Sequence, residues 1–142
     1  MKTSVKLAVI CCTAAALLAS GCVTSGSHTL SITEALNSKE AKASLDPSIK
    51  LEFAAGKGTV LRDGQVSNKK EAASDKTLNA DCIRTFVSAV KQLQEEARRA
   101  GATKVINIIS YYRKKPYSSA SLYECHAGGQ RVGVALKGDL AR

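Results

Sequence analysis

The feature of this 142-residue chain that most constrains its fold is one strong helical pattern between residues 81 and 100. Asp81 is the expected N-cap, Arg98 and Arg99 suit the negative end of the helix dipole, and Gly101 is typical of the residue after a last turn. A helix with one apolar stripe must bury that stripe against another layer, so the pattern predicts a helix packed on a sheet. Apolar side chains at 3.6-residue spacing form the stripe: Ile83, Phe86, Val87, Val90, Leu93 and Ala97.

Short strand patterns lie on both sides of this helix. The capping-box spacing at Ser31 predicts a short helix through about Lys42, and residues 68–79 are polar and without periodicity, which predicts a loop. The predicted strands cover residues 49–54, 59–67, 104–112, 121–127 and 131–137. Together these patterns predict an α+β fold in which one main helix, about 81–100, packs on an antiparallel sheet of about four strands.

The first 22 residues have the pattern of an export signal. Lys2 and Lys6 precede an apolar run over 7–18 that is too short to span a membrane, and residues 19–21 are the small residues that a signal peptidase requires. Small residues directly before Cys22 resemble the bacterial lipobox, which implies lipid transfer to the Cys22 thiol, cleavage before it and acylation of the new amino terminus. A retained apolar anchor and cleavage without lipid are the alternatives.

The lipobox divides the chain into three parts. They are a lipoprotein signal peptide (1–21), the lipidated Cys22 with a short tether (22–30), and a single periplasmic α+β domain (31–142). More than one acyl chain on Cys22 would anchor the protein stably to a membrane. Because Val23 is not the Asp that retains lipoproteins in the inner membrane, we expect the periplasmic face of the outer membrane.

Cysteine usage follows from this location. Two of the five cysteines leave with the signal peptide and Cys22 carries lipid, so Cys82 and Cys125 remain in an oxidising compartment. This favours a disulfide between them. Two free buried thiols, or a metal pair completed by His126, are the alternatives.

The mature domain is expected to be basic. The whole chain carries 21 Lys and Arg against 12 Asp and Glu, and loss of Lys2 and Lys6 with the signal peptide leaves 19 against 12, a net charge of +7. Such a surface favours anionic partners. In an envelope these are lipid headgroups, lipopolysaccharide, peptidoglycan stems or acidic proteins, whereas export removes the chain from nucleic acid.

The densest positive patch is the candidate binding site, formed by Arg113, Lys114, Lys115 and Tyr117. Basic side chains beside aromatic rings can hold phosphates, sugars or acidic peptides. The alternative is a solvated hairpin loop that only protects a sheet edge.

An enzyme is not expected. Of the two histidines, His28 lies in the predicted tether, which leaves His126 as the only candidate general base tuned near neutral pH. No Gly-x-Ser-x-Gly motif is present, and no metal site or cofactor is predicted.

Residues 101–112, 123–128 and 134–139 resemble a family of small exported bacterial proteins that are often labelled excinuclease ATPase subunits. The similarity runs from about Ile49 to Asp139. Residues 56–59 (Gly-Lys-Gly-Thr) lack the spacing and the following helix of a phosphate-binding loop, so ATP binding is not expected. More distantly, the layout of lipobox, helix-start Cys and later strand Cys is similar to the outer-membrane lipoprotein sensor of the Rcs envelope-stress pathway, which has two disulfides and a longer tether.

These observations lead to one functional expectation. The chain is expected to be a non-enzymatic outer-membrane lipoprotein whose periplasmic domain binds an envelope component in stress sensing. The alternatives are a structural lipoprotein without a ligand and a redox-sensitive switch built on Cys82 and Cys125.

Overall fold

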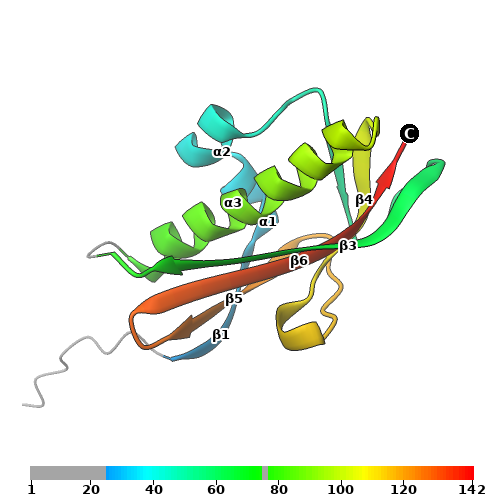
Figure 1. Ribbon diagram of the computed structural model, residues 1–142. Coiled ribbons are helices and arrows are strands. Elements are labelled where there is room, and N and C mark those ends of the chain that lie inside the picture. Colours follow the sequence, from blue (N-terminus) through cyan, green and yellow to red (C-terminus); the bar gives the residue numbers. More distant parts are fainter. Residues whose placement is uncertain (1–24, 75–76) are drawn as a thin grey trace, which may run out of the picture.

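The computed structural model describes residues 25–74 and 77–142, in which one long helix, α3 (Leu78–Arg99), lies across one face of a six-stranded sheet (Figure 1). Two short helices, α1 (Ile32–Leu36) and α2 (Lys39–Ser44), lie beside α3, and a 3-10 turn, η1 (Tyr112–Lys114), lies on the other side of the sheet. The strands are β1 (Gly26–Ser31), β2 (Lys50–Phe53), β3 (Val60–Ala72), β4 (Lys104–Ser110), β5 (Leu122–Gly128) and β6 (Arg131–Ala141). The mixed α and β composition with one main helix is confirmed.

Strand β6 is the centre of the sheet. Along one edge it pairs antiparallel with β3 over almost its whole length. Its other edge is divided between two strands, because β5 pairs with residues 131–133 and β4 pairs with residues 136–141. The sheet is completed by β1, antiparallel to β5, and by β2, parallel to β4. The prediction of about four strands, all antiparallel, is therefore wrong in strand number and in the β2–β4 pair.

Strand β1 corrects the predicted tether. Residues 26–31 pair with β5 from Gly26 opposite Ala127 to Ser31 opposite Leu122, so part of the segment assigned to the tether (22–30) belongs to the folded domain. His28, expected in the tether, lies opposite Cys125 in this ladder. The polar sequence shows no alternation because the strand lies at a sheet edge, where backbone hydrogen bonds rather than apolar burial hold it.

Three further boundaries differ from the sequence prediction. Strand β3 continues to Ala72, into the predicted loop, because its backbone pairs with β6 as far as Ala72 opposite Arg131. The helix predicted through Lys42 is two helices, since the Ser38 hydroxyl caps the second by accepting from the Ala41 N–H at 3.2 Å. Helix α3 starts earlier than Asp81, with the Thr77 hydroxyl as its N-cap.

The core lies between α3 and the sheet and is built on the predicted stripe. The Phe86 ring is fully buried and stacks between Phe53 and Tyr123, with ring centroids 6.0 Å and 4.1 Å away. Of the stripe, Phe86, Val87, Val90, Leu93 and Ala97 are buried, and Ile83 packs against them at the margin.

No helix among the described residues is long and apolar enough to cross a membrane.

Substituting Tyr123 by Phe is expected to stabilise the domain by about 1 kcal/mol. The Tyr123 hydroxyl is buried with no hydrogen-bond partner among the described residues. Burial, with a smaller effect of the Glu34 carboxylate, raises the pKa of the Tyr123 phenol, so the group stays neutral and its loss removes only an unpaired polar group. Urea denaturation measures the change, with Tyr117→Phe as the control for a partly exposed phenol. A loss of stability in Tyr123→Phe alone would contradict this assignment.

Candidate functional site

The predicted site residues fall in three separate places. Cys22, the predicted lipid acceptor, lies outside the described residues. Cys82 and Cys125 lie in the core between α3 and the sheet. The basic loop at 113–117 lies on the opposite face of the sheet, where η1 folds back over β6.

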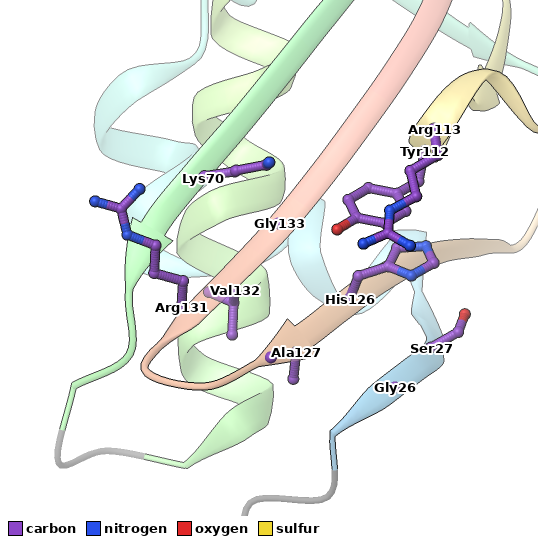
Figure 2. A pocket seen from close by; sticks show the side chains of 11 residues that line it. Gly26, Ser27, Lys70, Tyr112, Arg113, His126, Ala127, Arg131, Val132 and Gly133 are labelled. Atoms are coloured by element: carbon purple, nitrogen blue, oxygen red, sulfur yellow. The ribbon is translucent and has the colours of Figure 1, made fainter.

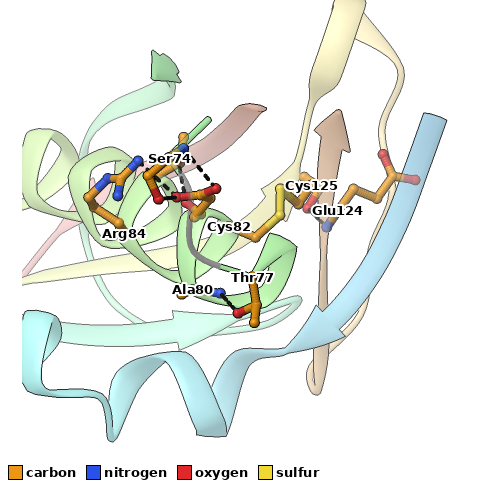
Figure 3. Close-up of a disulfide and its surroundings, with 10 residues drawn as sticks. Ser74, Thr77, Ala80, Cys82, Arg84, Glu124 and Cys125 are labelled. Carbon is orange, nitrogen blue, oxygen red and sulfur yellow. Dashed lines mark hydrogen bonds and ion pairs between the residues drawn. A yellow bond between two sulfur atoms is a disulfide. The ribbon is translucent and has the colours of Figure 1, made fainter. Parts of the chain in front are cut away.

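Cys82 and Cys125 form the disulfide that the sequence favoured (Figure 3). It joins the second turn of α3 to β5, with 5.8 Å between the two Cα atoms. Free thiols and a metal pair with His126 are therefore wrong. His126 follows Cys125 in the strand and so points to the other face of the sheet.

The disulfide is inaccessible in the folded domain. Both cysteine side chains are 0% exposed, and thiol–disulfide exchange requires a thiolate to reach a sulfur atom. Beside it the buried Asp81 carboxylate accepts from the Ser74 hydroxyl at 2.7 Å and lies 3.1 Å from the Arg84 guanidinium. This surrounding favours a structural bond over a redox switch.

The exposed face of the sheet carries a row of residues from four neighbouring strands. The ladders place Lys70 of β3 opposite Gly133 of β6, Gly133 opposite His126 of β5, and His126 opposite Ser27 of β1. Strand alternation turns this row away from α3, because Cys125 and Val132 next to it face the core.

The Tyr112 ring lies flat on this row. It stacks on the His126 imidazole with centroids 3.6 Å apart and planes at 10°. Glycine at 133 favours this close approach, since a Cβ atom there would lie 3.3 Å from Tyr112 Cε2 and the ring would have to move by a few tenths of an ångström. The His126 ring is held in turn by Glu124, whose Oε2 lies 3.1 Å from Nε2.

Arg113 extends from η1 over this stack. Its guanidinium carbon lies 5.5 Å from the Tyr112 ring centroid. Arg113 and Lys114 have φ values of 51° and 62°, in the left-handed region that side chains other than glycine rarely adopt. The conformation of this turn therefore costs backbone strain energy.

Two adjoining cavities, of about 380 and 330 Å³, open around the Tyr112–His126 stack, and Figure 2 shows the residues that line the larger one. We call them together the basic cleft. Lys70, Arg113 and Arg131 line the larger cavity, and among the described residues that line it none is acidic. Both cavities share four residues: Ser27, Tyr112, Arg113 and His126.

The predicted basic patch contributes only part of this cleft. Arg113 lines both cavities and Lys115 and Tyr117 line the smaller one, whereas Lys114 lines neither. Sequence reasoning did not assign the members supplied by the sheet: Ser27, Lys70, His126 and Arg131. One available signal was Gly133, because a glycine inside a strand pattern often marks a close approach of another group.

The geometry suits anion binding better than metal binding. Among residues 25–74 and 77–142 no group of three or more His, Cys, Asp or Glu side chains is placed to hold a metal ion.

Comparison with known proteins gave no match, whether with a family model, a curated protein or a solved structure.

Proposed function

We propose that the chain is an outer-membrane lipoprotein, anchored through Cys22, whose periplasmic domain binds an anionic envelope component without catalysing a reaction. The observation that carries this proposal is the basic cleft, in which Lys70, Arg113 and Arg131 line a cavity beside an aromatic stack. Closely spaced surface cations attract anions, and the low-dielectric walls of a cleft strengthen that attraction. Sensing of envelope stress is the cellular role that the resemblance to the Rcs sensor suggests.

The position of the cleft supports a partner close to the membrane. Gly26 and Ser27 form part of its wall, and Gly26 is four residues after Cys22. Four residues span at most about 14 Å when fully extended. An acylated Cys22 would therefore hold the cleft near the headgroup layer.

Substituting Cys22 by Ser is expected to abolish membrane attachment, because serine offers no thiol for lipid transfer. The variant should appear in the soluble periplasmic fraction or remain uncleaved. Carbonate extraction and intact-mass measurement test this. A wild-type protein that carbonate removes from membranes, or that carries no acyl mass, would refute the lipoprotein proposal.

Changing Arg113, Lys114 and Lys115 together to Glu is expected to abolish retention of envelope material by the lipidated protein. The melting temperature should hardly change, because exposed charges contribute little to folding. Retention by the wild type should also weaken with added salt, since charges are screened beyond roughly 10 Å at 0.1 M ionic strength.

The matched control reverses three exposed lysines on the helical side of the domain, Lys39, Lys42 and Lys91. It makes the same change in net charge and should retain envelope material. Equal retention by both triple variants would remove the basic loop as the binding site. Failure of the wild type to retain anything would favour a structural lipoprotein without a ligand.

A further inference from the structure

We propose that the basic cleft is a phosphate-ester site: it binds a phosphate group on a sugar or polyol, with the phosphate between Lys70 and Arg113. The carbon skeleton would lie against the Tyr112–His126 stack. This inference rests on the proposed function, because it names the chemistry of the anionic component.

The charge distribution points to phosphate. Lys70 from β3 and Arg113 from η1 line the same cavity; Arg131 also lines it, but its guanidinium points away from the Tyr112–His126 stack (Figure 2). No described lining residue of this cavity is acidic, and the Glu124 carboxylate, which lines the smaller cavity, lies 3.1 Å from His126 Nε2. A phosphate monoester offers more negative charge and more acceptor oxygens than a carboxylate, and a guanidinium can donate two parallel hydrogen bonds to a phosphate monoester or diester.

The size and floor of the cleft point to an ester rather than to a bare ion. The larger cavity, about 380 Å³, falls within the 300–1,000 Å³ typical of small-molecule sites. Its floor is an aromatic surface of two stacked rings, held flat on Gly133 and fixed by Glu124. Such a surface accepts the carbon face of a sugar or polyol beside the charged group.

The backbone of η1 supports a binding role for Arg113. Two consecutive non-glycine residues hold positive φ, an arrangement that costs folding free energy. Glycine would meet the same turn without that cost but would not place a guanidinium over the Tyr112 ring. Strain of this kind collects at ligand-binding positions.

Calorimetric titration of the full-length lipidated protein in detergent tests the ligand class. The probes are glucose 1-phosphate, glycerophosphoglycerol, inorganic phosphate, and glucuronate as a sugar with a carboxylate. At least one phosphate ester is expected to bind about tenfold more tightly than glucuronate and than inorganic phosphate. Preference for glycerophosphoglycerol would identify a phospholipid headgroup as the source, and preference for glucose 1-phosphate a phosphorylated sugar.

Two neighbouring substitutions test the residues. Arg113→Gly is expected to raise the Kd of the better ester at least about tenfold, the equivalent of one charge-assisted hydrogen bond, without lowering the melting temperature. Lys114→Gly likewise removes one positive charge from a residue with positive φ. Because the Lys114 side chain lines neither cavity, the Kd of this variant should stay within about twofold of the wild-type value. Lys70→Ala, from another strand, should weaken binding as Arg113→Gly does.

Equal weakening by Arg113→Gly and Lys114→Gly would overturn the site, because it would reduce the effect to net charge. Glucuronate binding as tightly as either ester would overturn the phosphate class but leave an anion-binding lipoprotein intact. Loss of the proposed function has a different signature, namely wild-type protein that retains no envelope material.

Discussion

Replacing Cys82 and Cys125 together by Ala is expected to lower the free energy of unfolding by roughly 4 kcal/mol. The bond closes a loop with a sequence separation of 43, and the chain-entropy relation gives this value for a loop of that length. Small domains are stabilised by only about 5–15 kcal/mol, so the loss would remove a large part of the total. Urea denaturation of oxidised wild type and of the double variant measures it.

Thiol labelling provides the complementary result. Unreduced protein labelled in denaturant should react with alkylating agent at neither Cys82 nor Cys125, because disulfide sulfur atoms carry no free thiol. Mild glutathione should leave the bond of the folded protein intact, because both side chains are fully buried. Ready reduction in the folded state would instead favour the redox switch. A double variant that is less than about 1 kcal/mol weaker than the wild type would contradict the structural role.

Substituting Gln94 by Met is expected to cost about 3 kcal/mol. The Gln94 side chain is only 2% exposed and holds the segment between α2 and β2 against α3. Its Oε1 accepts from the Asp46 N–H at 2.8 Å, and its Nε2 donates to the carbonyls of Asp46 at 2.9 Å and Ile49 at 3.0 Å. Methionine preserves the volume and the helix propensity but leaves the Asp46 N–H and the Ile49 carbonyl without their Gln94 partner, whereas the Asp46 carbonyl keeps the Ile49 N–H at 3.2 Å.

The matched control for Gln94→Met is Gln92→Met on the same helix. The Gln92 side chain accepts one hydrogen bond, at 3.2 Å from the Ser67 hydroxyl, so its loss should cost about 1 kcal/mol or less. Urea denaturation of both variants compares them. Equal costs would show that Gln94 contributes through packing and not through its hydrogen bonds.

The parts of the fold that the sequence predicts well are those encoded locally. The stripe from Phe86 to Ala97 appears as a helical period in the sequence and is buried in the structure. The disulfide followed from the expected compartment, which left only one pairing. Both inferences need no knowledge of which strands are neighbours.

Strand pairing defines the features that the sequence did not predict. Strand β1 and the last residues of β3 are polar, so only their ladders with β5 and β6 identify them as strands. The basic cleft has the same origin, because Lys70, Gly133 and His126 become neighbours only through the registers of three strands. Arg113 was predictable as a basic residue, but its place over the Tyr112 ring depends on a left-handed turn.

The central position of β6 has a consequence for the timing of folding. Strands β3, β4 and β5 all pair with this strand, which follows every one of them in the chain. The sheet therefore cannot close while the chain is being synthesised or threaded across a membrane until β6 has emerged. Folding that depends on such distant contacts is slow. Under the proposed export, this order of elements would keep the chain unfolded until it had crossed the membrane, and the sheet would assemble on the far side.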